Sequence, residues 1–134
     1  MEQKVLDFLA KEKVCVLAVI LPDGFPHTAT MHFAHQDGSI YLSTRSTSKK
    51  ASGLISGNTK ASITVGICEE EWTTMQMDGQ LEKVEDQPAK NIILAKYPDD
   101  AKHFDATAVF LKFTPVWWRY SDFKSTPPIF LASE

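Results

Sequence analysis

The segment 43–50, STRSTSKK, is the densest group of side chains in this sequence that could bind an anion. Each of its eight residues carries a hydroxyl or a positive charge, and an apolar run typical of a strand precedes it. Proteins bind phosphate with hydroxyls, backbone N–H groups at a helix start and Lys or Arg side chains that converge on one anion. A phosphate cradle and a solvated loop both fit this composition, so the residues alone leave the choice open.

Histidines suggest a second kind of chemistry, because His27, His32 and His35 lie within nine residues of one another. Histidine is a common metal ligand, but residues 27 and 32 of one strand project from opposite faces. No nearby carboxylate or thiol completes a familiar zinc spacing. The sequence therefore predicts no metal site, and these histidines are either hydrogen-bond donors to a ligand or ordinary surface residues.

The aromatic residues of the C-terminal half are Trp72, Trp117, Trp118 and Tyr120, with Arg119 between the last two. Such residues usually belong to a core or an oligomer interface. A Trp or Tyr beside an Arg can instead stack on a planar ring or close a pocket. Ser, His and Asp are present without a GxSxG motif, so the sequence gives no support for a serine hydrolase.

Composition limits the class of protein. The 134 residues fit a single domain over 1–134, with 43% hydrophobic and 23% charged residues. A net charge of −3 argues against generic binding to nucleic acid or to an anionic membrane. Cys15 and Cys68 stand alone in apolar runs, and the N-terminus lacks the apolar core of a signal peptide, so a cytoplasmic location is expected.

Hydrophobic periodicity predicts a helix over the first dozen residues and then strands over 14–21, 25–34 and 39–44. Asp-Gly turns separate these strands, which we expect to form a three-stranded antiparallel meander. A short helix should follow residue 50, and further alternating segments occupy 59–68 and 73–86.

The C-terminal third begins with a helix over 86–97, with Asp86 as its N-cap and Pro98 as its end. One or two strands follow, and residues 124–134 resemble an irregular tail. Six or seven strands with two or three flanking helices favour a mainly β protein, a small antiparallel barrel that leaves few open edges.

The order of these pieces resembles a known family. A strand, a D-G-x-P turn, an alternating strand, a second Asp-Gly turn and the segment Ser-Lys-Lys-Ala follow one another over residues 3–85. This order is similar to that of the pyridoxamine 5′-phosphate oxidase-like FMN-binding split β-barrels, in particular their short single-domain members. The resemblance implies a six- to seven-stranded antiparallel split barrel, a homodimer, and FMN bound between the two subunits.

The resemblance also assigns roles to residues of the phosphate segment. Ser43 and Thr44 fall where a hydroxyl contacts the flavin phosphate or ribityl chain. Ser48, Lys49 and Lys50 fall on the family's small-basic-Lys segment, which clamps the phosphate. STRSTSKK is then the phosphate cradle for FMN rather than a solvated loop.

Other contacts implied by the resemblance come from three strands. The backbone of the strand that begins at His27 lines the isoalloxazine ring, and a basic phosphate ligand lies further along it. Polar side chains before Gly79 reach the flavin from the partner subunit, and the last contacts lie near the C-terminus. The residues concerned are His27, Thr28, Ala29, Thr30 and His32 in the first strand, Thr74 and Gln76 in the second, and Trp117 and Arg119 in the third.

The chain also departs from the full-length oxidases of this family. Those enzymes begin the second strand with an Arg and carry a C-terminal Arg-x-His motif, whereas this chain has His27 and the sequence SDF after Arg119. We therefore expect a flavin-dependent oxidoreductase acting on a small molecule other than pyridoxamine phosphate. The alternatives are a non-catalytic flavin-binding or stress-related protein, or the same barrel holding a deazaflavin or haem.

Overall fold

The computed structural model describes residues 1–133, apart from the side chain of residue 55. Its order of elements is α1 (Gln3–Lys11), β1 (Val14–Ile20), β2 (Pro26–His32), β3 (Ala34–Gln36), β4 (Ser39–Arg45), α2 (Lys49–Ile55), β5 (Lys60–Val65), β6 (Thr73–Val84), α3 (Asp86–Lys96), the 3₁₀ helix η1 (Pro98–His103), β7 (Ala108–Asp122) and β8 (Ile129–Ala132). Among these residues, no helix is long and apolar enough to cross a membrane.

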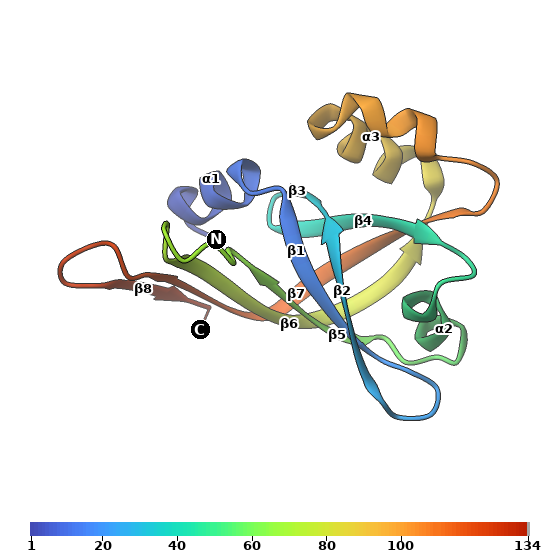
Figure 1. Ribbon diagram of the computed structural model, residues 1–134, viewed down its shortest axis with the longest axis horizontal. Coiled ribbons are helices and arrows are strands. Elements are labelled where there is room, and N and C mark those ends of the chain that lie inside the picture. The colour runs from blue at the N-terminus through green and yellow to red at the C-terminus, as the bar shows by residue number, and fades with distance from the viewer. Residues whose placement is uncertain (134) are drawn as a thin grey trace.

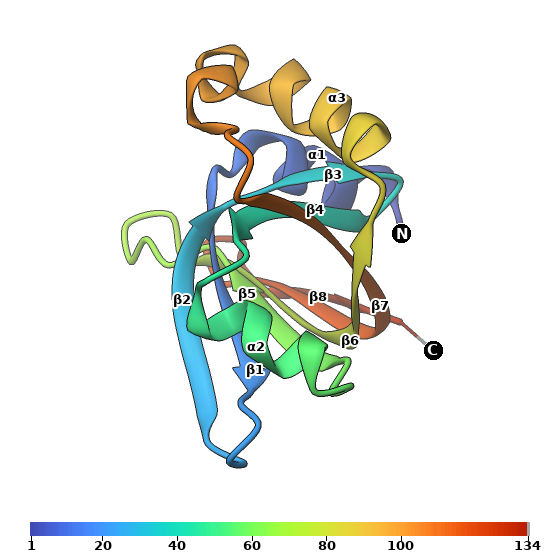
Figure 2. The ribbon, with the colours of Figure 1, turned by 90° about the vertical axis from the view of Figure 1, so that its right-hand side faces the viewer.

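All strands belong to one antiparallel sheet in the order β2-β1-β5-β6-β7-β4-β3, with β8 added beside β7. The sheet curls into a half-barrel, and α2 and α3 lie at the side where its two edges approach each other (Figures 1 and 2). The predicted mainly β antiparallel split barrel is confirmed. Eight strands are present instead of six or seven, because the predicted irregular tail contains β8 and because β3 is a separate three-residue strand.

The predicted meander over 14–44 is wrong in one respect. β2 pairs with β1, as predicted, but β3 and β4 pair with each other and β4 continues the sheet to β7. The chain passes from one edge of the sheet to the other at Phe33, whose side chain is buried in the core. Alternation of apolar residues shows which face of a strand is buried and does not show which strand lies beside it.

Both predicted Asp-Gly turns are present. Gly24 has a φ of 90°, and the backbone N–H of Phe25 donates to Asp23 Oδ1 at 3.1 Å. Asp37 and Gly38 have φ values of 52° and 87°, as a two-residue type I′ hairpin requires. These turns set the registers of the two hairpins that hold the edge strands, β2 beside β1 and β3 beside β4.

The core fills the concave face of the half-barrel. Leu17, Ile63, Met77 and Phe113 point inward from four different strands and are almost completely buried. The apolar face of α1 closes this core, because Val5, Phe8 and Leu9 pack against it. Each such side chain contributes about 1.5–3 kcal/mol by burial, so α1 is an integral part of the barrel.

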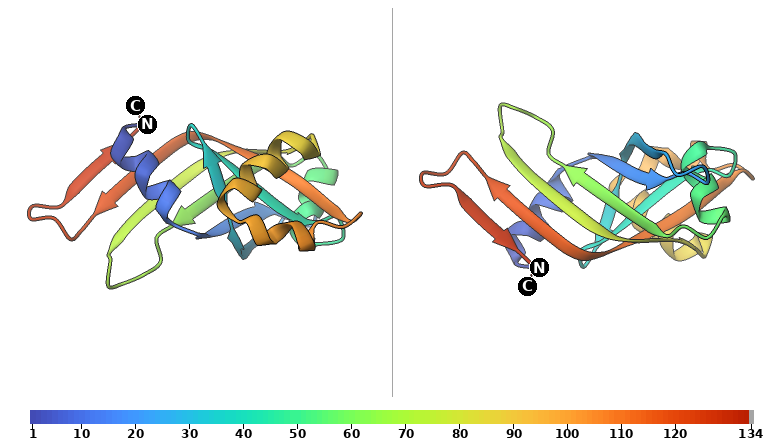
Figure 3. Two further views of the ribbon diagram at one scale, coloured as in Figure 1. Left: turned by 90° about the horizontal axis from the view of Figure 1, so that it is seen from above. Right: turned by 90° about the horizontal axis from the view of Figure 1, so that it is seen from below.

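The outer face of β4 is covered by α3 (Figure 3). Ala89, Ile93 and Tyr97 of α3 form a second apolar cluster with Ala34 of β3 and Phe110 of β7. The predicted helix over 86–97 is confirmed and ends before Pro98, but its N-cap is Glu85 and Asp86 is its first residue. The chain then continues as η1, which the sequence analysis missed.

The strands β6 and β7 extend beyond the barrel as a long arm on which β8 lies (Figure 1). Their register shifts between Asp78 and Gly79, where Val116 is the extra residue of a bulge. A Cβ atom on Gly79 would lie 2.2 Å from the carbonyl oxygen of Thr114, so only glycine allows this close approach. The bulge bends the arm away from the barrel.

Candidate functional site

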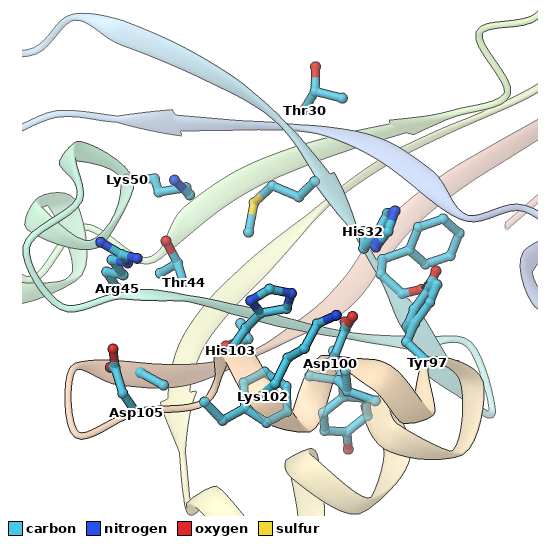
Figure 4. Close-up of a pocket in the computed structure, with 17 residues that line it drawn as sticks. Thr30, His32, Thr44, Arg45, Lys50, Tyr97, Asp100, Lys102, His103 and Asp105 are labelled. Atoms are coloured by element: carbon cyan, nitrogen blue, oxygen red, sulfur yellow. Dashed lines mark hydrogen bonds between the residues drawn. The ribbon is translucent and has the colours of Figure 1, made fainter.

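A pocket of about 560 Å³ opens between β2 and β4, the strands that face each other across the split in the barrel. Its walls come from β2, β4, α2 and the segment after α3 (Figure 4). Five residues that the sequence analysis assigned to a cofactor lie in these walls, namely Thr30, His32, Ser43, Thr44 and Lys50. Segments that are far apart in the order of the sheet thus contribute to one cavity.

The phosphate segment supplies a pair of hydroxyls at this pocket. Thr44 Oγ1 and Ser48 Oγ lie 3.0 Å apart, and either can donate to the other. Ser48 occupies the N-cap position of α2, yet its side chain makes no capping hydrogen bond. Its hydroxyl is directed toward Thr44 instead, so the Thr44 oxygen lies in the pocket wall and the Ser48 oxygen next to it, both with further capacity to donate and accept.

Positive charge reaches the same region from two sides. Lys50 enters the pocket from α2 and Arg45 from the end of β4, while Lys102 comes from η1 on the opposite wall, with the His103 ring beside it (Figure 4). The salt bridge found among residues 1–133 is remote from this pocket. Hydroxyls and cations on facing walls form the donor set that a phosphate monoester needs.

Acidic residues limit this positive charge to part of the pocket. Asp100 and Asp105 lie on the η1 side. Hydrogen bonds from the Thr107 side chain and backbone, at 2.6 and 2.8 Å, lower the pKa of Asp105, and the Arg45 charge adds to this effect. Asp105 is therefore ionised at neutral pH, and the excess of cations lies toward Lys50 and the hydroxyl pair.

His32 forms one end of the pocket. Its ring is stacked on that of Tyr97, with centroids 4.7 Å apart and planes 6° apart. The Tyr97 hydroxyl shares its single proton between the carbonyl oxygens of Phe33, at 2.6 Å, and Lys13, at 2.9 Å, which fixes the surface on which His32 lies. Burial raises the pKa of Tyr97 to about 12, so this hydroxyl keeps its proton. Within residues 1–133, no three His, Cys, Asp or Glu side chains gather as a metal site would require.

The structure does not bring every predicted residue to this pocket. Ser48 lies next to it and Lys49 is exposed beside it, whereas His27 and Ala29 point from β2 toward the concave face of the sheet. The others lie on the convex outer face, namely Thr28 of β2, Thr74 and Gln76 of β6, and Trp117 and Arg119 of β7. On that face Gln76 pairs directly with Arg119.

The outer face is unusually apolar for an exposed surface. Trp117, Val116 and Phe130 are 39%, 67% and 48% exposed there. The Arg119 guanidinium lies 4.8 Å from the centre of the Phe130 ring, at the range of a cation–π contact. Three strand spacings of about 4.8 Å separate Thr30 from Gln76, so the outer residues of β6 and β7 lie well away from the pocket of the same chain.

Residues of η1 are the main part of the pocket that the sequence analysis missed. They comprise Asp100, Lys102 and His103, followed by Phe104 and Asp105. Pro98 ends α3 and also begins η1, and a 3₁₀ helix of six residues has no periodic apolar pattern that distinguishes it from a loop. In the sequence, the charged residues after Pro98 were the feature that could have indicated this wall of the pocket.

Comparison with known proteins agrees with this architecture. The chain aligns over its full length with the conserved hypothetical protein Rv2991 from Mycobacterium tuberculosis (92% of that chain, 23% identity, TM-score 0.77). General Stress Protein 26 from Bacillus anthracis matches 98% of this chain and 97% of its own, with 23% identity and a TM-score of 0.75. A heme binding protein from Mycobacterium smegmatis matches 98% of this chain and 56% of its own, with 13% identity and a TM-score of 0.78.

At these identities the three structures show a shared fold. No curated protein matches the chain in sequence. The sequence profile described as pyridoxamine 5′-phosphate oxidase, however, matches residues 1–122, which is most of the chain. Together with the split barrel and the position of the phosphate segment at its opening, this match shows that the chain belongs to the pyridoxamine 5′-phosphate oxidase family.

Proposed function

We propose that this protein binds FMN, with the flavin phosphate held in the pocket between β2 and β4. The proposal rests on one observation. The Thr44–Ser48 hydroxyl pair and the Lys50 side chain come together at the N-terminus of α2. Residues predicted from the sequence to contact phosphate therefore lie together, with Arg45 beside them. Their donors fit a phosphate monoester, which accepts several short hydrogen bonds and carries up to two negative charges.

A homodimer completes this site in the proposal. Gln76, Trp117 and Arg119 lie on the outer face of β6 and β7, too far from the pocket to share a flavin with it in one chain. Pairing two outer faces would cover the exposed Val116 and Trp117 and would bring the polar residues of one subunit toward the pocket of the other.

The proposed activity is oxidation or reduction of a small molecule. Bound flavin supplies hydride or electron transfer, and the residues of this chain bind its phosphate and orient its ring. No side chain of the pocket needs to act as a general acid or base for that chemistry. Because His27 stands where the full-length oxidases carry Arg, the proposed substrate is a compound other than pyridoxamine phosphate.

The alternatives concern, first, which ligand occupies the barrel and, second, whether a bound flavin takes part in catalysis. The structural similarity to a heme binding protein makes haem a candidate, and His32 and His103 in the pocket walls are of the residue type that binds haem iron. The cationic hydroxyl-rich end of the pocket favours a phosphate ester over haem, and accepts a deazaflavin phosphate equally well. The similarity to a general stress protein leaves a non-catalytic flavin-binding role as the second alternative.

Titration with FMN and riboflavin tests the phosphate site directly. The two ligands differ only in the phosphate, so the wild-type protein should bind FMN at least 100-fold more tightly, because two charge-assisted hydrogen bonds contribute about 1.5–3 kcal/mol each. Equal affinities would contradict the proposed site. Reduction of the bound flavin by NADH or NADPH, followed by reoxidation by an added acceptor, would distinguish an enzyme from a flavin-binding protein.

A further inference from the structure

We propose that the pocket between β2 and β4 accepts FAD as well as FMN, with the adenylyl half of FAD bound along η1. FAD is FMN with an adenylyl group joined to its phosphate, so one site can hold the half that both molecules share. The inference rests on the proposed FMN site and concerns the part of the pocket that FMN would leave open.

The pocket is much larger than the phosphate group that the proposed function places in it. Its volume is about 560 Å³, whereas a phosphate takes the space of two or three water molecules, roughly 60–90 Å³. In the proposed site the flavin ring lies along the backbone of β2. Thr30 of that strand and Lys102 of η1 lie on different sides of the pocket (Figure 4). The space toward η1 is therefore open to a group attached to the far side of the phosphate.

The η1 wall offers one cation and one carboxylate to this space. Lys102 and Asp100 both line the pocket, and in the part of the chain that the structure describes no salt bridge or side-chain hydrogen bond engages either of them. Asp105 differs, because it accepts two hydrogen bonds from Thr107. Water satisfies Lys102 and Asp100 in the free protein, and polar groups of a ligand can replace that water.

These opposite charges determine which group fits the η1 wall. A lone anion would gain little, because Asp100 offsets the charge of Lys102, and a chain of carboxylates attached to the phosphate would meet Asp100 and Asp105. An adenylyl group instead presents a second phosphate followed by a ribose diol. An ammonium binds the phosphate, and a carboxylate accepts hydrogen bonds from ribose hydroxyls, as it does in dinucleotide-binding folds.

Ring surfaces for the adenine lie beside these charged groups. His103 and Phe104 line the same wall, and Figure 4 shows the His103 ring directed into the pocket. The Phe104 ring is held edge to face by the buried ring of Phe110, with centroids 5.0 Å apart and planes at 76°. Bases stack on aromatic side chains through their faces. Partners for the phosphate, the diol and the base are thus all present within residues 100–104.

Titration of the full-length protein with FMN and with FAD, followed by calorimetry, tests the inference. FAD should bind at least as tightly as FMN. Amide NMR shifts that FAD causes beyond those of FMN should centre on residues 100–105. If FMN bound but FAD bound tenfold more weakly, or if the additional shifts lay outside η1, the inference would be overturned and the proposed FMN site would stand. If neither flavin bound, both would be overturned.

Lys102→Met should weaken FAD binding about tenfold and FMN binding less than threefold, because only FAD has a second phosphate. Lys50→Ala should weaken the binding of both flavins, since it acts on the phosphate that they share. Lys83→Met, outside this pocket, is the control and should change neither affinity. Unchanged FAD affinity in Lys102→Met, or equal losses for the two flavins, would overturn the assignment of Lys102 to the adenylyl half.

Asp100→Ala distinguishes a contact with the ribose from simple repulsion of the phosphate. Loss of a carboxylate that accepts from the diol should weaken FAD binding several-fold, about as expected for one hydrogen bond, and leave FMN binding within threefold. Tighter FAD binding in this variant would show that Asp100 only repels the ligand, and would overturn the inference. The FMN affinity measured on the same preparation verifies that the pocket is folded.

Discussion

The ammonium of Lys96 lies 4.3 Å from the centre of the Phe33 ring, directly at the point where the chain crosses from β2 to β3. The same ammonium donates to the carbonyl oxygens of Leu9, at 3.1 Å, and of Glu12. The last turn of α3 is thereby attached both to the end of α1 and to the split in the barrel. Since η1 begins two residues later, the position of the η1 wall of the pocket between β2 and β4 depends on this contact.

Removal of the Lys96 ammonium should destabilise the protein. Lys96→Met retains most of the aliphatic side chain but leaves the Leu9 and Glu12 carbonyls without their donor, which should reduce the free energy of unfolding by about 1–3 kcal/mol. Chemical denaturation of the wild type and of this variant measures the difference. Lys90→Met, which alters the other lysine of the same helix, a partly buried side chain whose ammonium lies 5.8 Å from the centre of the Phe104 ring, is the control. Equal stability of wild type and Lys96→Met would show that the contact contributes nothing.

The pH dependence of stability should also report on Lys96. Burial lowers the pKa of Lys96 to about 8 despite its carbonyl partners, so between pH 8 and the unfolded pKa of 10.5 the unfolded chain binds more protons. Stability then rises with pH across this window, relative to Lys96→Met. Denaturation at pH 7.5 and 10 measures the change, and an NMR titration of the Lys96 side chain locates the pKa. If the free energy of unfolding of the wild type, relative to that of Lys96→Met, fell with increasing pH, this prediction would be contradicted.

Tyr97 should contribute to stability and not to cofactor binding. Tyr97→Phe removes the hydroxyl whose single proton lies between the carbonyls of Phe33 and Lys13, and should cost about 1–3 kcal/mol in free energy of unfolding. The ring that supports His32 remains, so FMN affinity should change less than threefold. Denaturation and FMN titration of the same preparation test both statements. A large loss of FMN affinity with unchanged stability would assign the hydroxyl to the ligand instead.

Lys49 and Lys50 should differ in their effect on FMN binding, although they are adjacent. Lys50 lines the pocket, whereas Lys49 is exposed outside it. Lys50→Ala should reduce FMN affinity by roughly 10- to 150-fold, since a hydrogen bond to a charged group contributes about 1.5–3 kcal/mol. Lys49→Ala is the matched control and should have a small effect. Flavin fluorescence titrations would reverse the assignment if Lys49→Ala caused the larger loss.

A charge at the bulge of β7 should separate the proposed dimer. Val116 is 67% exposed in the single chain, so Val116→Glu should leave the folded subunit intact and place two like charges in the proposed interface. Sedimentation should then show monomers with reduced FMN affinity, because the partner's contacts are lost. Lys83→Glu, at the far end of β6, serves as the control. If the Val116→Glu variant remained dimeric and kept its full FMN affinity, this face would be excluded as the interface.

The sequence was sufficient to predict most of the fold. Alternation in the strands, the two Asp-Gly turns and the end of α3 at Pro98 are local features, and the structure confirms them. The crossing at Phe33 and strand β8 were not predictable in this way, because strand pairing depends on distant segments. Residues 129–132 alternate for only four positions, which is too short a pattern to identify a strand.

The candidate site was predictable where it depends on local chemistry. The hydroxyl and cationic residues of STRSTSKK identified Thr44, Ser48 and Lys50, which lie together at the pocket. The opposite wall, formed by η1, comes from a segment about 50 residues later, and no local pattern connects Lys102 or His103 with the phosphate segment.

The visible absorption spectrum of the gel-filtered protein, with the released cofactor identified by mass, tests the central proposal most directly. Binding of FMN in the pocket between β2 and β4 predicts flavin bands near one equivalent per chain, either as purified or after incubation with FMN, and a released mass equal to that of FMN. A protein that stays colourless after incubation with FMN, or that shows the Soret band of haem instead, would contradict it.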